Sequence, residues 1–243
     1  MLTAESDVVP AHIEAGAHDD FAPEWRLKRA VDVVVAGGLL AVTSPALAMI
    51  ALAVRRDGGA AIYRAPRVGR DGTPFQMFKF RTMVVDADRI GPPSASDDDA
   101  RITSIGRCLR RFKLDELPQL LNVVAGDMSL VGPRPEVAQE VATYDDGERA
   151  ILQLRPGMTD YSSIVFSNEG ALLRGSPDPH AAYCRLIRPG KLRLGLEYGR
   201  RRSARTDLTI LGLTALAIVR PHAAGRAVCR IVPGVRELVP HLR

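Results

Sequence analysis

Cysteine and aromatic residues are scarce in this chain, and no internal repeat is visible. Aromatic side chains make up 5% of the 243 residues, and the three cysteines are Cys108, Cys184 and Cys229. An odd number of widely spaced cysteines fits neither a disulfide framework nor a zinc site. We therefore expect the protein to work in a reducing compartment.

A signal peptide is also missing from the first 24 residues, which lack the basic start and apolar centre of such a segment. They carry scattered small residues and five acids: Glu5, Asp7, Glu14, Asp19 and Asp20. This composition predicts a mobile acidic tail. The whole chain is 46% hydrophobic, enough to bury a core, and its net charge of +5 is mild, so charge matters chiefly where it clusters.

Only one long apolar run is present, at residues 33–54, with basic residues on both sides of it. It is long enough to span a bilayer, since about 20 residues suffice. Pro45 removes a helix hydrogen bond near its middle, and Ser44 before it is pushed away from helical geometry. The basic flanks favour the cytoplasmic side for both ends. We predict a re-entrant hairpin broken at Ser44-Pro45, with the Ser44 hydroxyl as an internal hydrogen-bond donor. A kinked span and a buried soluble helix are the alternatives.

Residues 62–83 read as two β-runs around Asp71-Gly72, a dipeptide typical of tight hairpin turns. In the second run, strand alternation places Lys79 and Arg81 on one face. Two cations on one face suit a diphosphate, although a surface strand with a lysine at its edge explains them equally well.

Residues 94–113 begin as a polar loop and become a basic helix that leads into Asp115 and Glu116, the acidic pair. The acidic pair precedes an apolar run that Gly126 is placed to end, which predicts one short helix with both carboxylates at its N-terminus. Neighbouring helix residues face different ways, so one carboxylate could attack while the other holds a metal ion. Arg134 stands between two prolines, so its backbone has little freedom, which would suit a side chain held in place to bind phosphate. The alternative makes Asp115 an ordinary N-cap and Arg134 a solvated loop residue.

The C-terminal third holds a basic cluster between residues 185 and 205, followed by an apolar segment at 208–219. Such a cluster fits anionic lipid head groups, and nucleic acid would also accept it. The apolar segment is too short to span a bilayer and predicts a core or interfacial helix. The stretch after Arg220 is expected to be peripheral.

Three segments together resemble the bacterial sugar transferases, the monotopic phosphoglycosyl transferases. They are the Ser-Pro break, the "RxGxxGxxFxxxKFR" segment that contains Lys79, and the block from Leu114 to Glu136. The resemblance covers residues 25–219. It implies that Asp115 attacks the sugar-bearing phosphate of a UDP-sugar, releases UMP, and passes the phosphosugar to polyprenyl phosphate. It also implies Mg²⁺ held by Glu116, and phosphate binding by Arg110, Arg134, Lys79 and Arg81. Residues 156–161 depart from the family's usual segment, so no sugar is assigned.

The expected fold is α+β: mainly helical, with a short β-hairpin, the re-entrant membrane helix and interfacial amphipathic helices. The expected divisions are an acidic tail (1–24), the membrane helix (25–56), a cytosolic catalytic domain on the membrane (57–220) and a peripheral basic tail (221–243). We expect the protein to lie at the cytoplasmic face of a bacterial inner membrane and to bind membrane lipids but no nucleic acid. The sequence is also compatible with a homo-oligomer. The rival functions are a non-catalytic, membrane-anchored lipid- or nucleic-acid-binding protein and a phosphohydrolase that uses the same site.

Overall fold

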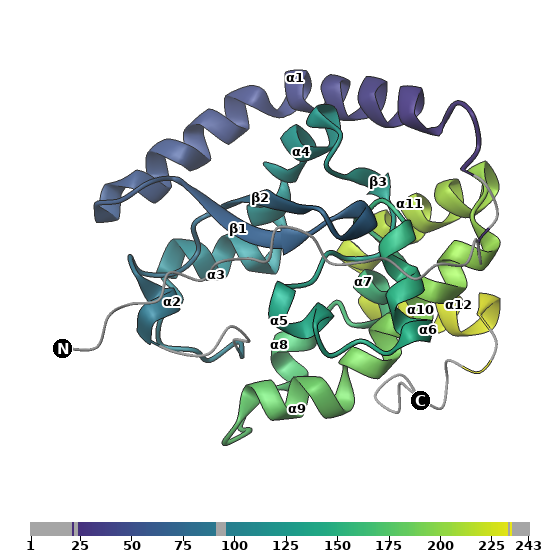
Figure 1. The fold of residues 1–243 in the computed structure, drawn as a ribbon. Coiled ribbons are helices and arrows are strands. Elements are labelled where there is room, and N and C mark those ends of the chain that lie inside the picture. Colours follow the sequence, from purple (N-terminus) through teal and green to yellow (C-terminus); the bar gives the residue numbers. More distant parts are fainter. Residues whose placement is uncertain (1–20, 22–23, 91–95, 233, 235–243) are drawn as a thin grey trace.

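The computed structural model describes residues 21, 24–90, 96–232 and 234, so the predicted acidic tail lies almost wholly outside the described residues. The described part is mainly helical, with a short antiparallel strand pair and one long apolar N-terminal helix, as predicted. Figure 1 shows that helix, α1 (Lys28–Val54), running along one edge of the body, with α4 (Gln119–Ala125) packed beneath it.

Helix α1 spans Lys28–Val54 without interruption and contains Pro45; the short 3₁₀ turn η1 (Arg55–Asp57) follows it. The missing N–H of Pro45 leaves the carbonyl of Ala41 without its helical donor. The Ser44 hydroxyl donates to that carbonyl at 2.9 Å, which confirms the predicted role of Ser44 as an internal donor. The predicted break of the helix is not seen. The backbone stays helical, and the two halves of α1 are inclined to each other (Figure 1).

The predicted hairpin is confirmed. Strands β1 (Ile62–Val68) and β2 (Pro74–Phe80) pair antiparallel, and the 3₁₀ turn η2 (Arg70–Gly72) joins them. Asp71 has φ = 54°, in the left-handed region that Asp and Asn tolerate best among non-glycine residues. Met77 on β2 belongs to the main core, whereas Phe80 packs with Val54 and Leu109 in a smaller cluster under the end of α1. The hairpin therefore ties α1 to the body.

The middle of the chain is built from short elements. After α2 (Ala87–Ile90), they are α3 (Ser104–Arg111), η3 (Leu114–Glu116), α4 (Gln119–Ala125), β3 (Ser129–Val131), α5 (Ala138–Val141), α6 (Asp146–Arg149), η4 (Ala150–Gln153) and β4 (Gly157–Thr159). Residues 137–154 do not form one continuous helix. Asp145 and Glu148 form a capping box that starts a new helix, α6, after α5 has ended.

Strands β3 and β4 pair in parallel, an interaction that the sequence analysis missed. The two backbones come so close that a Cβ atom on Gly157 would lie 2.1 Å from the nitrogen of Gly132. Glycine is therefore required at this contact, because any side chain would push the strands apart. The pairing brings the segment after the acidic pair next to residues 157–159.

The C-terminal third is helical and closes the core. Its elements are α7 (Tyr161–Val165), α8 (Glu169–Leu172), α9 (Pro179–Leu186), α10 (Arg188–Arg201), α11 (Ala204–Val219) and α12 (Pro221–Ile231). The prediction that the chain becomes peripheral after Arg220 is wrong for α12. Ala224 and Val228, one helical turn apart, are fully buried in the main core. Residues 233 and 235–243 lie outside the described part.

A buried polar network fixes the N-terminal end of α1. The ammonium of Lys28 lies 2.8 Å from one carboxylate oxygen of Asp207 and 3.9 Å from Asp32. Tyr198 donates to the other oxygen of Asp207 at 2.9 Å, and Ser129 donates to Asp32 at 2.6 Å. All three charged side chains are 5 to 7% exposed. The network joins α1 to α10, α11 and β3.

Candidate active site

The acidic pair lies in η3, a single 3₁₀ turn between α3 and α4. Lys113 enters this turn with φ = 56°, a left-handed conformation that reverses the chain after α3. Pro118 occupies the N-cap position of α4, and Gly126 ends α4 with φ = 103°, as predicted. The acidic pair therefore precedes α4 instead of capping it, and the interpretation of Asp115 as an N-cap is wrong.

Glu116 is held by two cations that come from different parts of the chain. Arg134 donates to both of its carboxylate oxygens, at 3.0 and 2.5 Å, and the ammonium of Lys79 lies 3.7 Å from one of them. Burial disfavours the charged carboxylate, but Arg134 and Lys79 outweigh it and lower the pKa of Glu116 to about 2. Glu116 is therefore an anion at any physiological pH.

Asp115 has a different environment from its neighbour. Its side chain is buried, and in the described part of the chain its Oδ1 accepts no hydrogen bond. Burial first, and the charge of Glu116 second, raise the pKa of the Asp115 carboxyl above its ordinary value. The surroundings of the two carboxylates therefore differ: Glu116 is paired with Arg134 and Lys79, whereas Asp115 keeps an oxygen for another partner.

Arg110 and Arg81 were both predicted to bind phosphate, and the structure places them differently. Arg110, in the last turn of α3, donates to the hydroxyl of Thr82 at 2.9 Å, and its charge acts on Asp115. Arg81 donates to the backbone carbonyls of Val54, Ala60 and Met83, at 3.0, 2.9 and 3.2 Å. Arg81 follows the last residue of β2, so the alternation of that strand does not fix its direction. The structure therefore brings Arg110, Lys79 and Arg134 towards the acidic pair and directs Arg81 to the end of α1.

Arg67 is a charged residue near the site that the sequence analysis did not single out. It lies on β1. Burial lowers the pKa of Arg67 below its ordinary value and is the largest effect; Glu136 raises this pKa, and Arg134 lowers it. The signal was available, because Arg67 is the first residue of the matched "RxGxxGxxFxxxKFR" segment. Asn122 was missed as well: fully buried, it fastens α4 to β2 by bonding the backbone of Gln76 and Phe78 at 2.7 and 2.9 Å.

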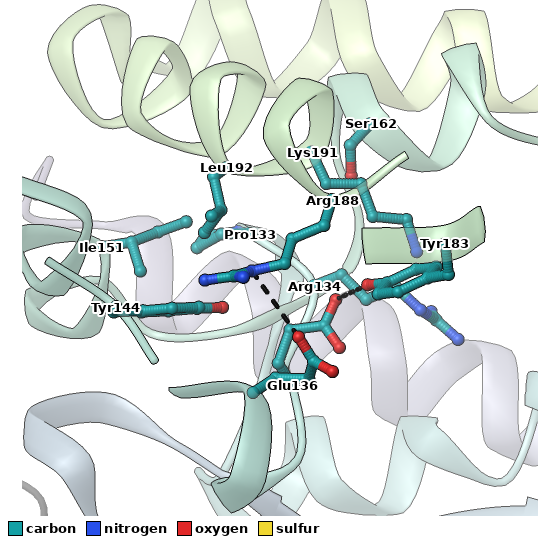
Figure 2. Close-up of a pocket in the computed structure, with 11 residues that line it drawn as sticks. Pro133, Arg134, Glu136, Tyr144, Ile151, Ser162, Tyr183, Arg188, Lys191 and Leu192 are labelled. Atoms are coloured by element: carbon teal, nitrogen blue, oxygen red, sulfur yellow. Dashed lines mark hydrogen bonds and ion pairs between the residues drawn. The ribbon is translucent and has the colours of Figure 1, made fainter. Parts of the chain in front are cut away.

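A recess adjoins the acidic pair on the far side of Arg134. Its lining includes Arg134, Glu136, Tyr144, Tyr183 and Lys191. Figure 2 shows the phenol of Tyr183 reaching Glu136, to which it donates at 2.8 Å. Arg134 lines the recess and also pairs with Glu116, so it connects the recess to the acidic pair.

The acidic pair provides ligands that suit Mg²⁺. Mg²⁺ prefers oxygen ligands and is usually held by one or two carboxylates together with substrate phosphates. The uncommitted, buried Oδ1 of Asp115 is one such ligand. Glu116 also fits, because an ionised carboxylate offers about four lone-pair positions and Arg134 and Lys79 occupy only part of them.

At least four of the eight basic residues from 185 to 205 pair with acids in the described part of the chain. Arg188 pairs with Glu140 and Glu148, and Lys191 pairs with Glu169. Arg200 and Arg201 both pair with Glu197, three and four residues before them. The positive charge of the cluster is therefore partly neutralised within the fold.

A known protein family matches most of this chain. The family described as "Bacterial sugar transferase" matches residues 23–221. The "Undecaprenyl-phosphate galactose phosphotransferase" of Salmonella typhimurium is 43% identical over 158 residues, which is 59% of this chain and 33% of that protein. The "UDP-glucose:undecaprenyl-phosphate glucose-1-phosphate transferase" of Escherichia coli is 42% identical over 143 residues, 57% of this chain and 31% of that protein.

A shorter relative is covered more fully. The "Exopolysaccharide production protein ExoY" of Rhizobium meliloti is 39% identical over 158 residues, 58% of this chain and 70% of that protein. By contrast, the matched region spans about a third of the Salmonella and Escherichia proteins.

Proposed function

The chain belongs to the bacterial sugar transferase family, and on that premise we propose that it transfers a sugar-1-phosphate from a UDP-sugar to a polyprenyl phosphate. The names of the Salmonella and Escherichia relatives support undecaprenyl phosphate as the acceptor and a UDP-sugar as the donor. One observation carries the proposal: the two neighbouring carboxylates have different surroundings. Glu116 is held between Arg134 and Lys79. Asp115 has a buried oxygen that accepts no hydrogen bond in the described part of the chain.

In the proposed first step, a carboxylate oxygen of Asp115 attacks the sugar-bearing phosphorus of the UDP-sugar. A phosphorus–oxygen bond forms to Asp115, the bond to the UMP phosphate breaks, and UMP leaves with the bonding electrons. In the second step, a phosphate oxygen of the polyprenyl phosphate attacks the same phosphorus and Asp115 leaves as a carboxylate. Covalent catalysis of this kind replaces one difficult displacement by two easier ones.

Charge neutralisation is the main requirement, because an anionic carboxylate must approach an anionic diphosphate. Lys79, Arg110 and Arg134 supply three positive charges against the two carboxylates of the acidic pair, so the site carries an excess positive charge for phosphate oxygens. Glu116 keeps Arg134 and Lys79 in place. Mg²⁺ held by Glu116 would neutralise phosphate charge further.

The site predicts a basic limb in the dependence of kcat/KM on pH. Burial and the neighbouring Arg134 lower the pKa of Lys79 from 10.5 to about 8, although Glu116 opposes them. Lys79 therefore loses its charge as the pH rises through about 8, and kcat/KM should fall by up to about tenfold per pH unit above that value. A Lys79→Arg variant stays charged, so its basic limb should move to higher pH. An unchanged limb in that variant would remove Lys79 from the phosphate site.

For the location, we propose the cytoplasmic face of the bacterial inner membrane, with α1 dipping into the bilayer and returning. By length and composition α1 could also cross a membrane, and only 6% of its most apolar 18-residue stretch is buried within the protein. Large side chains such as Val34, Val42 and Met49 are 69 to 80% exposed. A lipid environment would cover them.

Contacts at both ends of α1 favour the returning course. Lys28 anchors its start to Asp207, and Arg81 donates to the carbonyl of Val54 at its end, 3.0 Å away. A spanning helix would carry one end to the far side of the membrane, whereas here the body of the protein holds both ends.

The returning course predicts that both flanks of α1 react from the same side. Arg26 and Arg56 are exposed, and each can be replaced by cysteine in a background in which the three native cysteines are serine. Arg26→Cys and Arg56→Cys should both react with a membrane-impermeant maleimide in inverted vesicles and be protected in right-side-out vesicles. Labelling of the two sites from opposite sides would show a spanning helix instead.

The function itself is tested by measuring UMP release from a panel of UDP-sugars in detergent, with and without undecaprenyl phosphate. We expect a lipid-linked sugar diphosphate to accumulate only when the acceptor is present. Catalytic release of free sugar phosphate without the acceptor would identify a phosphohydrolase that uses the same residues. Absence of UMP release with every donor would indicate the rival function, a non-catalytic binding protein.

A further inference from the structure

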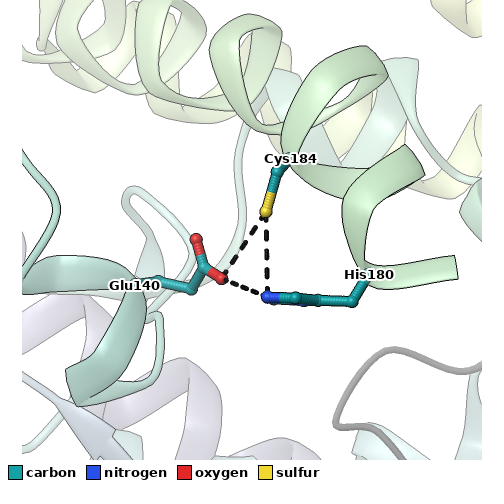
Figure 3. A group of neighbouring side chains, drawn as sticks. All are labelled: Glu140, His180 and Cys184. Carbon is teal, nitrogen blue, oxygen red and sulfur yellow. Dashed lines mark hydrogen bonds and ion pairs between the residues drawn. The ribbon is translucent and has the colours of Figure 1, made fainter. Parts of the chain in front are cut away.

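Three side chains with metal-binding atoms meet at a second place in the fold. Glu140 comes from α5, and His180 and Cys184 come from α9, where a spacing of four residues puts them on one face of the helix. Figure 3 shows the carboxylate, the imidazole and the thiol pointing towards one another. Their nearest atoms are 3.5 Å apart for His180 Nε2 and Glu140 Oε1, and 3.9 Å apart for Cys184 Sγ and each of the other two.

These separations are within a few tenths of an ångström of those between ligands around one small ion. Zinc bonds of about 2.0 to 2.3 Å at tetrahedral angles place pairs of ligand atoms about 3.4 to 3.6 Å apart. As a direct contact between His180 and Glu140, 3.5 Å is long, because a charge-assisted N–H···O hydrogen bond is about 2.7 to 2.9 Å. Each of the three ligand atoms would interact more favourably if it moved a few tenths of an ångström towards a shared metal ion.

The surroundings of Glu140 prepare its carboxylate for such a role. Its side chain is 10% exposed, and Arg188 lies 3.5 Å from Oε2, the oxygen that faces away from the cluster. Oε1 is the oxygen that meets His180 and Cys184. Partners of this kind, which orient a ligand through its other atom, are usual around protein metal sites.

We propose that Glu140, His180 and Cys184 bind a transition-metal ion such as Zn²⁺, with a fourth position left for water or another ligand. A thiolate and an imidazole favour Zn²⁺ or Co²⁺ and disfavour Mg²⁺, so this site is separate from the acidic pair in both place and chemistry. Bound metal would fasten α9 to α5 beside the recess that Glu140 and Arg134 line. The inference does not depend on the proposed transferase activity.

The test uses the full chain, freed of metal and kept reduced in detergent, with Co²⁺ as the probe. Thiolate ligation should give a cobalt charge-transfer band in the near ultraviolet that saturates at one ion per chain and is displaced by Zn²⁺. Zn²⁺ at 100 times its dissociation constant should raise the melting temperature by at least about 5 °C. Mg²⁺ at the same concentration should not displace Co²⁺.

Matched variants assign the band to its ligands. Cys184→Ser should abolish it, and His180→Gln should weaken Co²⁺ binding by about 10-fold or more. The double variant Cys108→Ser, Cys229→Ser keeps Cys184 as the chain's last thiol and should retain the band. His222 begins α12 after a proline, just as His180 begins α9, so His222→Gln is the control for the histidine and should change nothing.

Two results would overturn the proposal, whether or not the transferase activity is found. One is the absence of the band in the wild-type chain, a result that does not depend on any variant folding. The other is a band that is lost in the Cys108→Ser, Cys229→Ser double variant, because the cobalt would then be bound by other thiols.

Discussion

Replacing Asp115 by asparagine is expected to lower turnover by about 10³-fold or more, because an amide cannot serve as the attacking nucleophile. The substitution keeps the size of the side chain, so the turn η3 and the pairing of Glu116 with Arg134 should survive. The measurement is the rate of UMP release with both substrates present. Binding of the UDP-sugar should change far less than the rate.

The matched control is Asp71→Asn, at the hairpin turn. Asp71 is exposed and has φ = 54°, a conformation that asparagine adopts readily, so this variant should keep wild-type turnover. If Asp115→Asn retained more than a tenth of the wild-type rate, the nucleophile would have to be sought elsewhere.

Replacing Lys28 by methionine should destabilise the protein by about 3 to 5 kcal/mol, the usual cost of removing one partner from a buried ion pair. The side chains of Lys28 and Asp207 are 5 and 7% exposed, and the change would leave Asp207 and Asp32 both buried without their shared cation. The neutral donors Tyr198 and Ser129 would remain. The free energy of unfolding in detergent, measured by denaturant titration, tests this.

An exposed ion pair provides the comparison. Arg174 and Asp97 lie 3.4 Å apart with side chains 60 and 53% exposed, so Arg174→Met should cost at most about 1 kcal/mol. Equal losses in the two variants would contradict the view that the network around Lys28 anchors α1.

The features that sequence analysis predicted correctly are local ones. Asp71-Gly72 specifies its own hairpin, Gly126 ends its own helix, and Ser44 stands next to the proline whose missing donor it replaces. The acidic pair and its cations lie in segments whose order and spacing match a known family, so their assembly could be expected even though β2 and η3 are far apart in sequence.

What was missed depends on contacts that no short pattern records. Strands β3 and β4 have three residues each, too few for an alternation pattern, and only the close approach at Gly157 reveals their pairing. Strand alternation put Arg81 on the same face as Lys79, but β2 ends at Phe80, one residue before Arg81. The cluster of Glu140, His180 and Cys184 escaped because the cysteines were judged by their spacing from one another, whereas the third ligand atom comes from a different helix.

The central claim is that Asp115 becomes covalently bonded to the phosphosugar. Its most direct test is the intact mass of the wild-type chain after incubation with a UDP-sugar that it accepts, in the absence of polyprenyl phosphate. The account predicts a gain of one sugar phosphate per chain, located on the peptide that contains Asp115 and lost when polyprenyl phosphate is added. Release of UMP only when both substrates are present, with no adduct at any time or with the adduct on another residue, would contradict it.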